Sequence, residues 1–309
     1  MISKMLFGAN GVLQKGYAGY SDIAAFIFSR ETAYTISATF GSGTENAGCN
    51  SSTKAYYGGG NAGSYNRIYD LIFSAKETSS LLSATLVTGR VALGTVNSTT
   101  RGYWVGGYLP ASNLPSSEID GIIFSSDTIT NPAAALSTAL FRDTATVCSS
   151  TKGYVCGGTN NTITPNTRKL VNYLTYSSET ITNLGDALSA SSQGGAGVNS
   201  TTIGYSALGW VGSSDPLTSA PNASPRIEKV TFATDTIAAF GSNLSVGRMS
   251  LSAFNNAQKG VFTGGETQFL SGSTTTVEKL VFATETLSVV STASLFRQYT
   301  TGTQSGGFL

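Results

Sequence analysis

Ser149-Ser150-Thr151-Lys152-Gly153-Tyr154-Val155-Cys156-Gly157-Gly158 is the stretch of sequence that decides the fold. It reads as a turn of small residues, a short apolar strand and a pair of glycines. Versions of it recur along the chain, centred on Tyr17, Tyr56, Tyr103, Tyr205 and Val261. This recurrence indicates that one small structural unit is used six times.

A second motif follows each of these strands, and it consists of an aromatic residue, small residues, an acid and a threonine. Successive copies are 46, 50, 52, 56 and 50 residues apart. Their threonines are Thr32, Thr78, Thr128, Thr180, Thr236 and Thr286. A period of about fifty residues is typical of propellers and solenoids, and each unit has room for four short strands. We predict an all-β fold, a six-bladed β-propeller with four antiparallel strands per blade.

The glycines and aromatic residues of the repeat have expected places in such a ring. We expect the glycine pairs to remove side chains where the inner strands of adjacent blades crowd together. We expect the tyrosines and phenylalanines to supply apolar area between blades. None of these aromatic residues is therefore a candidate catalytic group.

An arginine recurs before several of the apolar strands, at Arg90, Arg142, Arg248 and Arg297, whereas the first and fourth units lack a clear counterpart. Together with the Gly-Gly pair and the aromatic third strand, this pattern resembles the kelch repeat over all six units. The resemblance implies a kelch-like β-propeller. The units are poor in charge and rich in Ser and Thr, and they are also similar to kelch-like repeats in structural proteins of tailed bacteriophages. That resemblance implies a virion protein, part of a tail fibre or baseplate, which is assembled in the host cytoplasm and contacts the host envelope.

The two ends of the chain suggest how the ring closes. Residues 296–303 look like another first strand, whereas the first unit begins well only at Gly16. We expect the C-terminal strand to complete the first blade and remove its open edge. Residues 1–14 would then be an attachment arm before a propeller of residues 15–309, or they could supply the closing strand themselves.

Composition narrows the function. Charged residues make up 11% of the 309 residues and the net charge is +1, which argues against nucleic acid as a partner. No apolar run approaches the roughly 20 residues that a membrane helix needs, and the first residues are too short a candidate for a signal peptide. We therefore expect no membrane insertion. The three cysteines are read as small buried thiols.

Catalysis is not expected. The chain has no histidine, which removes the usual proton shuttle, the Ser-His-Asp arrangement and the commonest metal ligand. The glycine pairs end strands and open no helix, so they do not match a nucleotide-binding loop. We predict no catalytic residues, no metal site and no cofactor.

The two faces of the ring should differ. The turn face, made by the turns between strands one and two and between strands three and four, should carry a ring of alternating charges. These are the acids Glu31, Glu77, Asp127, Glu179, Asp235 and Glu285 and the bases Lys15, Lys54, Arg101, Lys152 and Lys259, with Ile203 in place of the sixth base. The charges could be paired surface groups, or they could form a flat docking surface.

The opposite face, the loop face, carries loops of variable length. Variable loops on a rigid scaffold are where binding usually resides. Amides beside exposed aromatic rings suit sugar hydroxyls, although plain spacer loops would have the same composition. The candidate binding residues are Tyr65, Tyr108, Asn113, Asn160, Asn161, Asn222, Gln268 and Phe269.

These observations leave three hypotheses open. The first is a non-catalytic virion protein that recognises a host surface glycan or receptor, most simply a polysaccharide. The second is a purely structural virion decoration or adaptor that docks other virion proteins through residues 1–14. The third is a cellular kelch-type scaffold for protein partners.

Overall fold

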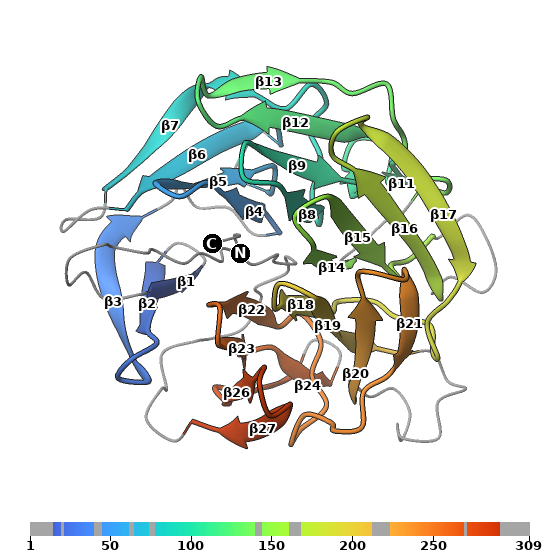
Figure 1. Cartoon of the computed structure of the whole chain (residues 1–309). Helices are drawn as coiled ribbons and strands as arrows, with labels where there is room; N and C mark the ends of the chain where they lie inside the picture. Colours follow the sequence, from blue (N-terminus) through green and yellow to red (C-terminus); the bar gives the residue numbers. More distant parts are fainter. Residues whose placement is uncertain are drawn as a thin grey trace.

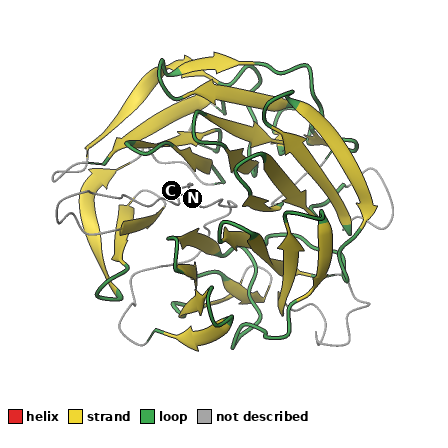
Figure 2. Cartoon of the chain, in the orientation of Figure 1, coloured by secondary structure: helices red, strands yellow, loops and turns green. Residues whose placement is uncertain are grey.

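The computed structural model describes residues 15–19, 22–39, 45–61, 65–73, 78–139, 144–160, 168–211, 223–268 and 271–290. These residues form a six-bladed β-propeller (Figure 1). Figure 2 shows strands and loops in the described part of the chain and no helix. The predicted all-β propeller of six blades is therefore confirmed. The described residues include no helix that is long and apolar enough to cross a membrane.

The blades follow one another around the ring in chain order, and the first strand of each four-stranded blade lies nearest the axis (Figure 1). Blade 1 comprises β1 (Lys15–Gly19), β2 (Asp22–Ile27) and β3 (Thr32–Thr39). Blade 2 comprises β4 (Ala47–Asn50), β5 (Lys54–Gly58), β6 (Arg67–Ile72) and β7 (Thr78–Thr85). Blade 3 comprises β8 (Gly94–Asn97), β9 (Arg101–Val105), β12 (Ile119–Ile123) and β13 (Thr128–Thr130). Blade 4 comprises β14 (Ala145–Cys148), β15 (Lys152–Cys156), β16 (Leu170–Thr175) and β17 (Thr180–Asp186). Blade 5 comprises β18 (Ala196–Asn199), β19 (Ile203–Trp210), β20 (Ala223–Thr231) and β21 (Thr236–Ala239). Blade 6 comprises β22 (Ser252–Asn255), β23 (Lys259–Thr263), β26 (Val277–Val281) and β27 (Thr286–Val289).

Blade 1 has three strands among the described residues, in the order β1-β2-β3. The other five blades each have four antiparallel strands. Residues 296–303 and 1–14, the two segments expected to supply the missing strand, lie outside the described residues. Which of them closes the ring therefore stays a prediction.

The repeated Ser-x-Thr sequence builds the inner turns. Ser51 Oγ accepts hydrogen bonds from the N–H groups of Thr53 and Lys54, at 3.1 and 3.0 Å. Ser98, Ser149 and Ser200 make the same pair of bonds in blades 3, 4 and 5. A side-chain oxygen thus satisfies the backbone donors of a tight turn, which is why small hydroxyl residues recur there.

Single glycines at the start of the second strands allow adjacent blades to approach. A Cβ at Gly102 would collide with Cys49 of blade 2, and one at Gly153 would collide with Val96 of blade 3. In blades 1 to 5 a tyrosine near the start of the second strand stacks on an aromatic ring of the following blade, so it supplies apolar area between blades as predicted. These pairs are Tyr17–Phe73, Tyr56–Phe124, Tyr103–Tyr176, Tyr154–Phe232 and Tyr205–Phe282, with ring centroids 5.4 to 5.8 Å apart.

The glycine pairs were expected where the inner strands of adjacent blades crowd together, but they lie against the connection between two blades. Gly59 and Gly60 have φ angles of 73° and 86°, in the left-handed region that favours glycine. A Cβ at Gly59 would collide with the carbonyl of Arg90, and one at Gly107 would lie 2.6 Å from the carbonyl of Val91. The pairs therefore let the connection between two blades pass close to the end of a strand.

Hydrogen bonds tie the inner strands to one another around the axis. Thr95 Oγ1 donates to Gly48 O at 2.8 Å, and Thr146 Oγ1 donates to Thr95 O at 2.6 Å. At the end of the same strands, Cys148 N donates to Asn199 Oδ1 at 3.3 Å. The inner strands of neighbouring blades belong to separate sheets, and these side-chain hydrogen bonds link them to one another.

Candidate functional site

On the loop face, three blades carry additional strand structure beyond the four-stranded sheet. Two of its loops fold as small hairpins, β10 (Tyr108–Leu109) with β11 (Leu114–Pro115) in blade 3 and β24 (Glu266–Gln268) with β25 (Ser271–Ser273) in blade 6. In blade 5 the strand pair itself is longer, because β19 continues to Trp210 after a register shift between Ala207 and Gly209. The extra residues of the fifth unit therefore form a bulge and a rim.

Two of the predicted aromatic residues flank one connection between blades. The carbonyl of Tyr65, in blade 2, accepts the N–H of Arg90 at 2.9 Å. Tyr108, in blade 3, bonds to Val91 in both directions, at 3.1 and 3.0 Å. Since Arg90 and Val91 are consecutive, the backbones of the two tyrosines flank one short stretch of chain, Tyr65 on the blade 2 side and Tyr108 on the blade 3 side. Tyr65 is 37% exposed and Tyr108 is half-buried.

The tip of the blade 3 hairpin adds an amide and an apolar side chain to this region. Asn113 has a φ of 55°, and its N–H donates to Leu109 O at 2.8 Å. Asparagine tolerates this left-handed conformation better than most residues, which explains its place at the turn. Leu114, the next residue, is 48% exposed. We call Tyr65, Tyr108, Asn113 and Leu114 the blade 2/3 rim.

A buried ion pair supports the blade 2/3 rim from below. Arg90 is 0% exposed, and its guanidinium bonds to Asp120 and to the carbonyls of Gly106 and Glu118. Burial lowers the pKa of Arg90 and raises the pKa of Asp120, and the charge of each group opposes the shift of the other. The connection that carries both tyrosine contacts is therefore anchored by a desolvated pair.

The remaining predicted residues are not part of this rim. Asn160 is 3% exposed, and its Nδ2 donates to Ala139 O at 2.8 Å, so the side chain holds the loop from inside. Gln268 ends β24, and its backbone is paired with Ser271. Asn161, Asn222 and Phe269 lie outside the described residues. Sequence reasoning missed Leu114, although an apolar residue inside a polar loop was a usable signal.

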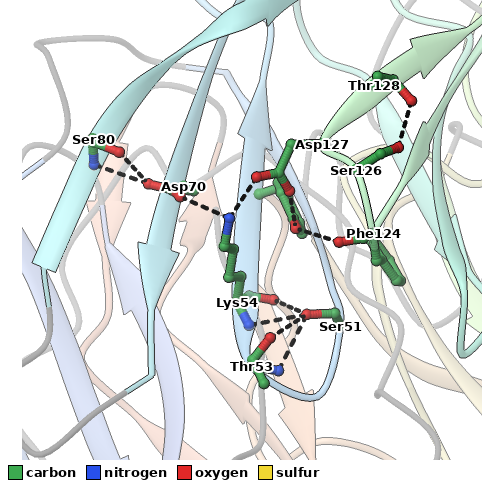
Figure 3. A network of polar contacts seen from close by, with 10 residues as sticks. Ser51, Thr53, Lys54, Asp70, Ser80, Phe124, Ser126, Asp127 and Thr128 are labelled. Carbon is green, nitrogen blue, oxygen red and sulfur yellow. Dashed lines mark hydrogen bonds and ion pairs between the residues drawn. The ribbon is translucent and has the colours of Figure 1, made fainter.

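The turn face carries most of the predicted acids and bases, and the described ones named below pair between blades; Figure 3 shows one of these pairs. Lys54 Nζ of blade 2 lies 2.5 Å from Asp127 Oδ2 of blade 3, and the hydroxyl of Tyr56 donates to Asp127 Oδ1 at 2.6 Å. Lys54 also lies 3.5 Å from the buried Asp70. The other described pairs are Arg101–Glu179, Lys152–Asp235, Lys229–Glu285, Lys259–Glu31 and Lys279–Glu31.

The exceptions in the sequence are compensated at this face. Where Ile203 replaces the base of blade 5, Lys229 of the third strand reaches Glu285 at 2.5 Å. Where Val261 replaces the tyrosine of blade 6, Lys279 supplies a second cation to Glu31 at 2.6 Å. Glu77, which would face Lys15, is outside the described residues. The described charges are thus used within the ring, which favours paired charges over a charged docking surface.

The acids of this face adopt a conformation that costs backbone energy. Glu31, Asp127, Glu179, Asp235 and Glu285 all have φ between 50° and 54°, where glycine would be easier. A carboxylate is found in each of these turns, and each one reaches a base of the preceding blade. The side chain is therefore required for the contact between blades.

Among the described residues, no group of three or more His, Cys, Asp or Glu side chains is placed to hold a metal ion. A comparison with models of known protein families finds no match, and a comparison with curated proteins finds no similar sequence. The resemblance to kelch repeats therefore stays a prediction from the repeated residues, whereas the structure shows the propeller.

Proposed function

We propose that this chain is a non-catalytic binding module and that the blade 2/3 rim of its loop face recognises a surface glycan. The observation that supports this most directly is that the backbones of Tyr65 and Tyr108 bond to the consecutive residues Arg90 and Val91, with the exposed Leu114 in the same hairpin as Tyr108. Aromatic and apolar surface stacks on a sugar ring, while amide and hydroxyl groups bond to its hydroxyls. The rigid ring below keeps these groups in place before the ligand arrives.

The resemblance to kelch-like structural proteins of tailed bacteriophages points to the source of the glycan. On that basis the chain is a virion component of a tail fibre or baseplate, and the glycan is a polysaccharide of the bacterial host. The pairing of charges on the turn face is compatible with this proposal, since it leaves the loop face as the more variable of the two surfaces.

Adsorption to bacterial cells tests the proposal. Labelled protein should bind cells of a suitable host, and the binding should disappear when the surface polysaccharide is stripped. Tyr65→Ala should weaken adsorption about tenfold or more, because one stacked aromatic ring contributes on the order of 1–3 kcal/mol to a well-packed contact. Leu81→Ala, at an exposed position on β7 away from the rim, is the matched control and should bind normally.

Adsorption that survives stripping, or that is equal for the two variants, would contradict the assignment of this rim. Protein that enters particles but binds no host cells would favour a purely structural decoration or adaptor instead.

A further inference from the structure

Blades 3 and 6 each bury one arginine at the start of the blade. Arg90 bonds to Asp120 on β12, and Arg248 bonds to Glu278 on β26; both arginines are 0% exposed. The second terminal nitrogen of each arginine donates to two backbone carbonyls, which for Arg248 are Gly264 O and Thr276 O. The guanidinium thus fills a pocket whose other walls are hydrogen-bond acceptors.

Blade 5 keeps the carboxylate of this pocket and has lost the arginine. Gly60 N bonds to Arg90 O and Gly158 N bonds to Ser192 O, so Ser192 occupies the arginine position. Ser192 Oγ donates to Leu208 O at 2.5 Å, as Arg90 does to Gly106 O in blade 3. Glu228 faces Ser206 in the register of β19 and β20, as Asp120 faces Trp104 in blade 3.

The carboxylate of Glu228 is only half satisfied. Glu228 is 0% exposed, and its Oε1 accepts hydrogen bonds from the N–H and hydroxyl of Ser189. In the described part of the chain its Oε2 has no hydrogen-bond partner, and the hydroxyl of Ser206, which is also 0% exposed, has only the weakly bonding thiol of Cys156 beside it. Arg226 Nη1 lies 3.3 Å from Ser189 Oγ, so the hydroxyl of Ser189 separates this cation from Glu228 Oε1. Among the described residues, Glu228 makes no ion pair.

The interface beside Glu228 is built from small side chains. At the equivalent positions of two other interfaces, one of the two side chains is large. Trp104 packs on Gly58 between blades 2 and 3, and Phe262 shares an apolar cluster with Ala207 between blades 5 and 6. Between blades 4 and 5 the pair is Cys156 and Ser206, which lie side by side. Burial raises the pKa of Cys156 to about 12, with a contribution from the charge of Glu228. The pocket therefore has less side-chain volume than its counterparts and acceptor oxygens on its walls.

We infer that the pocket bounded by Glu228, Ser206 and Ser192 binds one monovalent cation, in the place that an arginine guanidinium takes in blades 3 and 6. A buried carboxylate without a counter-charge is strongly unfavourable, so the loss of the arginine must be compensated. The available ligands are a carboxylate oxygen and two hydroxyls, which suit a hard cation such as Na⁺ or K⁺. One unpaired negative charge matches one positive charge. This inference is independent of the proposed function.

The test is the thermal stability of the full chain in different salts of equal ionic strength. Protein dialysed into tetramethylammonium chloride is titrated with NaCl, KCl or RbCl. One of the small ions should raise Tm saturably, by about 2–5 °C, because a ligand bound only to the folded state stabilises it. Crystals soaked in RbCl should show an anomalous scattering peak in contact with Glu228 Oε2.

Two variants separate this site from general salt effects. Ser192→Arg supplies the guanidinium in place of the ion, so its Tm should no longer depend on which cation is present. Glu278→Gln is the matched control, because it weakens the filled pocket of blade 6 and should keep the ion dependence of the wild type. A wild-type Tm that is the same in every chloride salt, together with crystals that show no peak at Glu228, would overturn the inference and leave a proton or a water molecule at Oε2.

Discussion

Phe254 and Val261 face each other across β22 and β23, and they reverse the sizes found at the same two positions in the other four-stranded blades. In blade 4 the corresponding pair is Val147 and Tyr154. The ring of Phe254 lies 5.8 Å from that of Phe28 in blade 1 and so takes the place of the missing tyrosine. Each interface between blades needs one large ring, and either of the two strands can supply it.

Exchanging these two residues tests the size rule. Phe254→Val should destabilise the protein by roughly 2 kcal/mol, because it leaves a cavity against Phe28. Val261→Tyr should also destabilise it, by about 1–3 kcal/mol, because two rings would compete for one space. The double variant should recover most of the loss in urea unfolding. Additive losses in the double variant would mean that the two positions do not share one space.

A substitution series at Asp127 separates backbone strain from the contact between blades. Asp127→Ala should lower the free energy of unfolding by roughly 2 kcal/mol. It removes the bonds to Lys54 and Tyr56, and it leaves alanine in a left-handed backbone conformation that alanine disfavours. Asp127→Gly should cost about 1 kcal/mol less than that, since glycine adopts this conformation freely. Asp127→Asn should be the mildest change. Urea unfolding measures all three, and a glycine variant more stable than the wild type would show that the contact contributes less than the backbone strain costs.

Acid should weaken the junction between blades 6 and 1. Burial acts to raise the pKa of Glu31, but hydrogen bonds and charges from Lys259 and Lys279 outweigh it and lower the pKa below its ordinary value of 4.5. A lowered pKa in the folded state means that stability is fully present above pH 4.5 and is lost as the pH falls through the folded pKa. The destabilisation caused by Glu31→Gln should therefore be largest near neutral pH and shrink below pH 4.5.

Unfolding of the wild type and Glu31→Gln at several pH values measures this difference. Lys279→Met removes one of the two cations, so it should show an intermediate pH dependence. A constant difference between the wild type and Glu31→Gln at every pH would contradict the assignment.

A weak member of the ring of hydrogen bonds near the axis is found at Cys148. Asn97 N donates to Cys148 Sγ at 3.4 Å, whereas Asn199 N donates to Asn255 Oδ1 at 3.2 Å. Sulfur is a weak acceptor, so Cys148→Asn should stabilise the protein by about 0.5–1 kcal/mol. Cys148→Ala, which removes the acceptor, should lose about 1 kcal/mol or more. Thermal unfolding should therefore rank Asn above Cys and Cys above Ala, and any other order counts against the ring.

The pair beneath the blade 2/3 rim links stability to binding. Arg90→Met leaves Asp120 buried without its partner and should cost about 3–5 kcal/mol. The double variant Arg90→Met with Asp120→Leu removes both charges and should recover much of that stability. If the rim is the binding site, the double variant should still adsorb to host cells, because the backbone contacts of Tyr65 and Tyr108 do not use either charge. Urea unfolding and adsorption are measured on the same preparations.

The sequence by itself determined the features that depend on near neighbours in the chain. The repeat of about fifty residues specified six units, and the Ser-x-Thr turns follow from bonds within a few residues. The division into a regular turn face and an irregular loop face was also readable, because the order of strands within one unit sets the side on which each connection lies.

Only the tertiary structure decided which of these groups meet. Lys54 and Asp127 are 73 residues apart and belong to different blades, so no local pattern pairs them. The same holds for the backbone bonds of Tyr65 to Arg90 and Tyr108 to Val91, and for Asn160, whose amide turns inward to Ala139. Local periodicity determines strands and turns, whereas contacts between blades depend on how the ring places one blade against the next, which is a property of the whole chain.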